Sequence, residues 1–109
     1  MTVLELTQLT HWTMINSGPL EAPIEGVYVG DLLSYVMGNA KPQQAWVTMQ
    51  THQNVIAIAS LKEFSVLILI DGNSMDEEAL QSARDNDISI LVSPLPAYET
   101  IQKLVQLGL

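Results

Sequence analysis

The chain has 109 residues, 48% of them hydrophobic, and its twelve acidic and four basic residues give a formal net charge of −8. This length fits one domain with one core, and the apolar fraction excludes intrinsic disorder. The absence of cysteine excludes disulfides, thiol nucleophiles and cysteine zinc sites. The four basic residues are too few and too scattered to bind nucleic acid or an anionic membrane surface: Lys41, Lys62, Arg84 and Lys103.

The chain also lacks sequence signals for a membrane or for export. Its longest unbroken apolar runs, residues 55–59 and 66–70, have five residues each, whereas a membrane span needs about 20. The first residues, MTVLELTQL, lack the basic start and the long apolar stretch of a secretory signal. We therefore expect a soluble cytoplasmic protein with no membrane partner.

The first quarter of the chain predicts a small helix and a strand. Apolar residues recur at helical spacing over residues 2–9, and the apolar stretch 12–15 predicts a strand. A turn is predicted at residues 16–19. We expect one domain over residues 1–109, in which residues 1–23 form a helix-strand cap on a body made of residues 24–109.

The body begins with a strand that runs into a helix. Residues 27–29 are β-rich and end at Gly30-Asp31, after which apolar residues recur at helical spacing from Leu32 to Met37. Asp31 is predicted to cap this helix, because an Asp side chain can accept a hydrogen bond from a free N–H group of the first turn.

Residues 45–49 predict the next strand, and the polar patch 50–54 follows it. The apolar segment 55–61 fits either a strand or a buried helix by periodicity alone. We predict a helix, since no Gly or Pro separates Gln50 from Asp71 to allow a hairpin, and alanines favour helix.

The last third repeats the strand-helix unit twice. Strand 66–70 precedes a helix that begins at Asp76, and strand 88–92 precedes a final helix with apolar residues from Tyr98 to Val105. Strands that alternate with helices of about ten residues indicate βαβ crossovers. We predict a three-layer α/β fold, with a mainly parallel sheet of about five strands and helices on both faces.

Ligands of open α/β sheets gather at the carboxyl ends of the strands. Polar residues follow each predicted strand, and the parallel topology would place them at one edge of the sheet. The candidate ligand-binding residues there are Gly30, Asp31, Thr51, His52, Asn54, Asp71 and Gly72.

Helix caps and turns select the same residue types, so a purely structural role explains this set as well. His52 is a candidate general base, but the sequence shows no nucleophile for it. No P-loop, dinucleotide-binding, zinc-protease or serine-hydrolase motif is present. We expect no metal, no cofactor and no enzymatic activity.

Residues 26–40 (GVYVGDLLSYVMGNA) and 45–54 (AWVTMQTHQN) closely resemble stand-alone DRTGG-domain proteins of anaerobic bacteria. Such proteins are often labelled as HPr serine kinases, because the domain is similar to the N-terminal domain of HPr kinase/phosphorylase. The resemblance implies a three-layer α/β domain. It does not imply a kinase, since the phosphate chemistry of HPr kinase/phosphorylase resides in a separate P-loop domain.

The chain departs from the motif that names the family. Gln50-Thr51-His52 stands where longer members carry Gly-Asp-Arg, and Asp71-Gly72-Asn73 stands where they carry Thr-Gly-Gly. The missing Arg removes a natural ligand for an anion, so the resemblance does not by itself imply a phosphate-binding role.

Two functional hypotheses follow. The first is a regulatory or protein-interaction domain, homodimeric, beside a metabolic or redox enzyme; Trp12, Trp46 and abundant Val, Ile and Leu leave apolar surface for self-association. The second is a sensor of a nucleotide or metabolite at the carboxyl ends of the strands.

Overall fold

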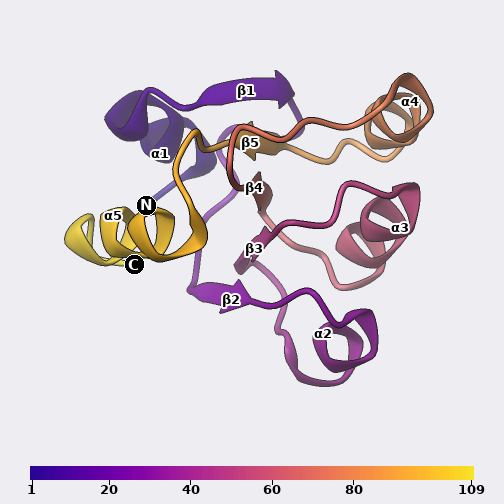
Figure 1. Cartoon of the computed structure of the whole chain (residues 1–109), viewed down its shortest axis with the longest axis horizontal. Coiled ribbons are helices and arrows are strands. Elements are labelled where there is room, and N and C mark those ends of the chain that lie inside the picture. Colours follow the sequence, from indigo (N-terminus) through magenta and orange to yellow (C-terminus); the bar gives the residue numbers. More distant parts are fainter.

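Helices and strands alternate along almost the whole chain in the computed structural model, which describes residues 1–109 (Figure 1). In chain order the elements are α1 (Val3–Thr10), β1 (Thr13–Asn16), β2 (Val27–Val29), α2 (Leu33–Asn39), β3 (Ala45–Thr48), α3 (Gln53–Leu61), β4 (Val66–Leu69), α4 (Glu77–Asp85), β5 (Ile90–Val92) and α5 (Ala97–Gln106). None of these helices is both long enough and apolar enough to cross a membrane.

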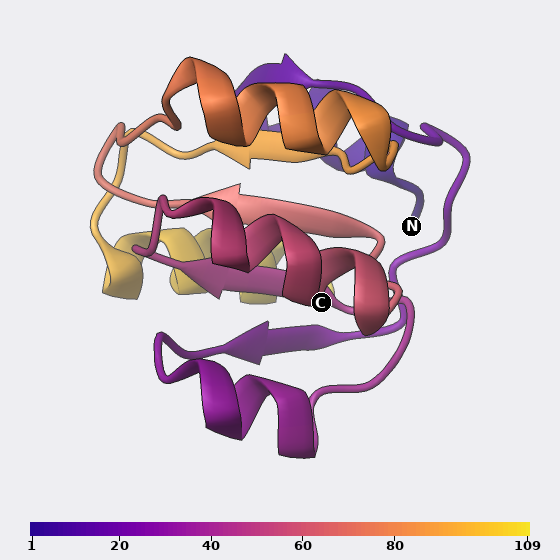
Figure 2. The same cartoon turned by 90° about the vertical axis from the view of Figure 1, so that its right-hand side faces the viewer.

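The five strands form one sheet in the order β1-β5-β4-β3-β2. Strands β2 to β5 are parallel to one another, and β1 pairs with β5 in the antiparallel direction. Helices α2, α3 and α4 lie on one face of the sheet, and α1 and α5 lie on the other (Figure 1, Figure 2). The predicted α/β fold with a mainly parallel, five-stranded sheet is therefore confirmed.

Strands β3, β4 and β5 are buried along their whole length. Successive side chains enter two separate apolar clusters, as Trp46 and Val47 of β3 do. Trp46 stacks on Phe64 with ring centroids 5.2 Å apart, and its indole Nε1–H donates to the Gly30 carbonyl at 2.9 Å. Burial on both faces explains why these strands read as continuous apolar runs in the sequence.

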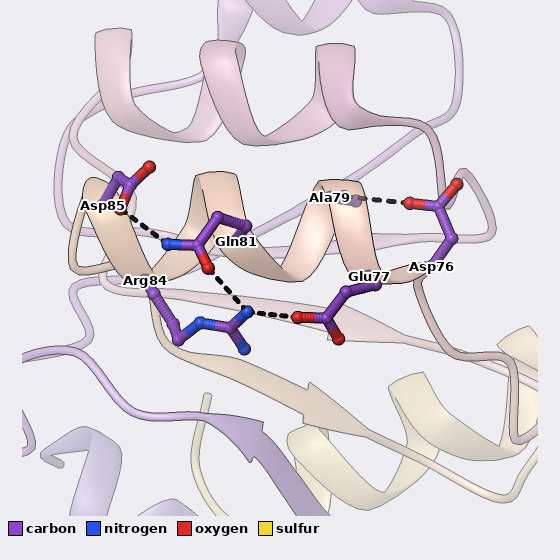
Figure 3. A network of polar contacts seen from close by, with 6 residues as sticks. All are labelled: Asp76, Glu77, Ala79, Gln81, Arg84 and Asp85. Carbon is purple, nitrogen blue, oxygen red and sulfur yellow. Dashed lines mark hydrogen bonds and ion pairs between the residues drawn. The ribbon is translucent and has the colours of Figure 1, made fainter.

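Helices α2, α3 and α4, which share one face of the sheet, begin and end close to where the sequence predicts. The ambiguous segment 55–61 lies in α3, which confirms the helix. Asp76 caps α4 by accepting the Ala79 N–H at 2.9 Å (Figure 3). On the exposed side of the same helix Arg84 pairs with Glu77, which is the only ion pair of the chain.

The N-terminal segment, which we expected to form a cap, is built into the sheet and core. Its strand β1 is an edge strand on β5, and Val3 and Leu6 of α1 are fully buried in the same apolar cluster as Leu91. The chain after β1 passes close to the start of β5: a Cβ on Gly18 would lie 2.1 Å from the Asp87 carbonyl oxygen. Residues 1–23 therefore pack with residues 24–109 around one sheet.

A capping box fixes the first turn of α1, and its loss tests the contribution of this helix. Thr2 Oγ1 accepts the Glu5 N–H at 3.2 Å, and Glu5 Oε1 accepts the Thr2 N–H at 3.0 Å. We predict that Thr2→Ala lowers the free energy of unfolding by about 1 kcal/mol in denaturant titrations. Gln8→Ala, an exposed change without a cap, is the control, and equal losses in both variants would contradict the prediction.

The same capping box predicts a pH dependence. The hydrogen bonds from Thr2 hold the pKa of the Glu5 carboxyl below its ordinary value. A lowered folded-state pKa stabilises the protein above the unfolded pKa, and this contribution is lost as the pH falls through the folded pKa. The stability difference between the wild type and Glu5→Gln, which removes the carboxylate charge, should therefore shrink in acid, as measured by denaturant titrations from neutral pH downward.

Candidate functional site

The loops that follow β2, β3, β4 and β5 lie at the same end of the sheet, which we call the carboxyl-end rim (Figure 2). All seven candidate residues from the sequence belong to these loops or to the first residues of the helices after them. No hydrogen bond joins the loops after β2 and β3 to those after β4 and β5. The rim therefore has two halves, which we describe in turn.

The prediction that Asp31 caps α2 is wrong. The cap position belongs to Leu32, which makes no side-chain hydrogen bond. Asp31 Oδ1 instead accepts from Thr48 Oγ1 at 2.7 Å and from the Met49 N–H at 2.8 Å, both at the end of β3. The Thr48 side chain is buried and needs a partner, so the carboxylate is drawn to the neighbouring strand rather than to its own helix.

His52, which we considered as a general base, caps α3. Its Nδ1 accepts the Asn54 N–H at 3.1 Å, and this is the only hydrogen bond of its side chain. Thr51 and Asn54 make no side-chain hydrogen bonds, and no hydroxyl is bonded to the imidazole. In this half of the rim Gly30, Asp31 and His52 therefore have the structural roles that caps and strand ends require.

Asp71 and Gly72 form a tight loop at the other half of the rim. Both have left-handed backbone conformations, with φ of 57° and 66°. Their N–H groups donate to the carbonyls of Leu95 and Ser93, each at 2.8 Å, so the loop after β4 is fixed to the loop after β5. The Asp71 side chain is exposed and makes no hydrogen bond.

A cavity of about 350 Å³ opens at this half of the rim; we call it the rim cavity. Of the seven candidate residues only Gly72 lines it. The complete lining is His11, Trp12, Thr13, Ile15, Gly72, Ser74, Val92 and Pro94. His11 and Thr13 are not among the predicted site residues, because only the antiparallel pairing of β1 with β5 brings the α1–β1 connection to the rim. Ser74, in the loop after β4, is predicted only as a cap or turn residue.

The lining of the rim cavity combines the apolar residues Trp12, Ile15 and Val92 with polar ones. Every buried side-chain polar atom of the protein has a hydrogen-bond partner, so no buried group is left free for a ligand. No three His, Asp or Glu side chains come together as a metal site would need. Acidic residues begin α4 directly after the loop that lines the cavity, which disfavours anionic ligands there: Asp76, Glu77 and Glu78.

Comparisons with known proteins identify the fold but no family. No family model matches the sequence, and no curated protein matches it. A solved structure that resembles the chain is that of the CBS and DRTGG domains of the regulatory region of Clostridium perfringens pyrophosphatase, complexed with the activator diadenosine tetraphosphate. The TM-score is 0.71 at 13% identity, over 93% of this chain and 44% of that one. The chain thus spans less than half of that structure and has a DRTGG-like fold.

The strand-end role of Asp31 predicts a loss of stability on substitution. Asp31→Ala leaves the Thr48 hydroxyl and the Met49 N–H without their acceptor, and we expect the free energy of unfolding to fall by about 1–3 kcal/mol. Asp31→Asn keeps an oxygen acceptor and should restore most of this stability in denaturant titrations. The matched control is Asp71→Asn, at an exposed carboxylate without hydrogen bonds; a loss there as large as in Asp31→Ala would contradict the assignment.

Proposed function

We propose that this chain is a non-catalytic regulatory domain of the cytoplasm that acts through protein contacts as a homodimer. The proposal includes kinship with the DRTGG domain at the N-terminus of HPr kinase/phosphorylase, and a metabolic or redox enzyme as the regulated partner. The DRTGG-like fold supports it, since the similar pyrophosphatase structure belongs to a regulatory region. The use of Asp31 and His52 in strand ends and caps supports a role outside catalysis.

The observation that carries the proposal is an exposed apolar stripe on α5. Tyr98, Ile101 and Val105 follow one another at helical spacing, while Thr100 and Leu104 bury the opposite side of the helix against the sheet. Tyr98 is 74% exposed and Val105 63% exposed. Together with Gln102 and Gln106 these side chains line a shallow hollow of about 400 Å³. An apolar surface of this kind is typical of a protein contact.

The charge distribution favours a second copy as the occupant of this stripe. No charged residue lines the hollow on α5. Five of the acidic residues belong to α4 and its flanks on the other face of the sheet, where Arg84 is already paired: Asp76, Glu77, Glu78, Asp85 and Asp87. Two copies that meet through α5 therefore keep their most acidic helices apart, which lowers the repulsion between two chains of charge −8.

Sedimentation velocity at micromolar concentration tests the dimer. We expect the wild type to sediment as a dimer, and Val105→Glu to raise the dimer dissociation constant by about 100-fold or more, because the twofold symmetry buries the new charge twice. The control is Leu61→Glu. Leu61 is exposed at the end of α3, on the opposite face of the sheet from α5, and this variant should remain dimeric. A wild type that sediments as a clean monomer would contradict the proposal.

Ligand sensing at the rim is a second candidate function, and the rim cavity is the observation that favours it. Its mixed lining suits a small molecule with an apolar part and one or two polar groups. The acidic start of α4 makes a neutral or cationic metabolite a better candidate than a nucleotide.

A thermal-shift panel of nucleosides, amino acids and nucleotides tests this second function. A ligand present at 100 times its dissociation constant adds about 2.7 kcal/mol to stability. We expect stabilisation by an uncharged or cationic compound, and its loss in Ser74→Trp, which fills the cavity. His52→Ala, in the other half of the rim, is the control; a ligand lost by His52→Ala and kept by Ser74→Trp would place the site on the residues predicted from the sequence.

A further inference from the structure

We propose that the free edge of β2 binds an extended peptide segment of a partner protein that has alternating apolar residues and a basic residue at each end. This inference rests on the proposed role in protein contacts and names the chemistry of the partner. The peptide would add a sixth strand to the sheet next to β2, with main-chain hydrogen bonds supplying affinity.

The hydrogen bonds of β2 leave one side of its backbone free. The Gly26 carbonyl accepts from the Ala45 N–H at 2.8 Å, and the Gly30 N–H donates to the Val47 carbonyl at 3.2 Å. In a parallel ladder alternate residues bond to the neighbouring strand, so the N–H and C=O groups of Val27 and Val29 point away from β3. No other strand pairs with β2 there, and these groups form an open template for a further strand.

The two edges of the sheet differ in their protection against such pairing. The other edge strand, β1, has a register shift between Met14 and Asn16, and irregularities of this kind twist an edge away from a partner. Strand β2 has a regular register and contains neither Pro nor Lys. Of the two edges, β2 is the one open to strand addition.

Exposed apolar side chains occur in β2 and in the segment that follows it. Val29 is 48% exposed, and Leu32 and Tyr35 of the following segment are 61% and 65% exposed. Val27 packs in the cluster on the α1 and α5 face of the sheet, and Val29, two residues later in the strand, points to the same face. An added strand with an apolar side chain on this face would cover Val29.

The acidic residues at the two ends of β2 favour a peptide with basic ends over a second copy of the chain. Glu25 and Asp31 flank the strand, neither is in an ion pair, and only one oxygen of the Asp31 carboxylate accepts hydrogen bonds. If two copies paired antiparallel through β2 in the register centred on Tyr28, Glu25 of each copy would face Asp31 of the other, and like charges opposite each other are destabilising. A segment with Lys or Arg at both ends instead places opposite charges there.

Nuclear magnetic resonance of the ¹⁵N-labelled full chain tests the proposal. The probe is a seven-residue peptide with blocked ends, lysine at each end and alternating threonine and valine between. We expect the amide signals of Val27 and Val29 to shift and their hydrogen exchange to slow, with a smaller effect on Tyr28, whose N–H already faces β3. The matched peptide with glutamate at both ends should bind about fivefold more weakly or worse.

Two variants and one altered peptide complete the test. Val29→Pro removes an outward N–H at a position where an edge strand tolerates proline, and should weaken binding at least tenfold. A peptide with proline at its fourth and fifth positions, one of which faces β2 in either strand direction, probes the same bonds without touching the fold. Glu25→Lys should weaken binding of the lysine peptide about two- to threefold. Equal binding by folded Val29→Pro and by the proline peptide would overturn the proposal, as would signal shifts confined to α5 or the rim cavity.

Two further outcomes separate this inference from the homodimer. Val105→Glu, which should dissociate the dimer, should leave peptide binding unchanged, so a dimer without peptide binding overturns only the β2 inference. Slow hydrogen exchange at Val27 and Val29 that depends on protein concentration in the absence of peptide would identify a second copy as the occupant and overturn the proposal.

Discussion

The fold depends on burying the central strands on both of their faces. Strands β3, β4 and β5 expose no residue, so each needs a layer of helices on either side. The three connections between parallel strands place α2, α3 and α4 on one face, which leaves only α1 and α5 for the other (Figure 1). The N-terminal segment is therefore part of the core, and the outer strand β2 is less covered than the three central strands, as the exposure of Val29 shows.

The same constraint explains the polar residues at the carboxyl-end rim. Where buried strands leave the core, their last N–H and hydroxyl groups need acceptors, and helices that start there have free N–H groups. Asp31 serves the end of β3, His52 serves α3 and Asp76 serves α4. Polar side chains that follow parallel strands in a sequence can therefore be explained by hydrogen bonds to strand ends and helix starts, without a ligand.

The fold followed from the sequence because burial on both faces leaves a clear pattern of apolar runs separated by amphipathic helices. The partner of Asp31 did not follow, since a carboxylate beside a helix start can serve that helix or the adjacent strand, and only the register of β2 on β3 decides between them. The rim cavity could not be predicted from the sequence either, because nothing local in residues 11–15 indicates an antiparallel pairing with β5, some 75 residues later. The seven candidate residues remain a prediction for ligand binding.

Asp31 and His52 are engaged in the fold, and the two surfaces that we propose for protein contacts lie outside the rim, are apolar and belong to different elements. The α5 stripe belongs to a helix, and the β2 edge belongs to a strand at the side of the sheet. If two copies join through α5 about a twofold axis, each dimer carries two β2 edges, one on each copy. A partner with two extended basic segments could then bind both edges at once, and its affinity would depend on dimerisation although no partner atom touches α5. Dimerisation would then control partner binding, a form of regulation that needs no catalytic residue.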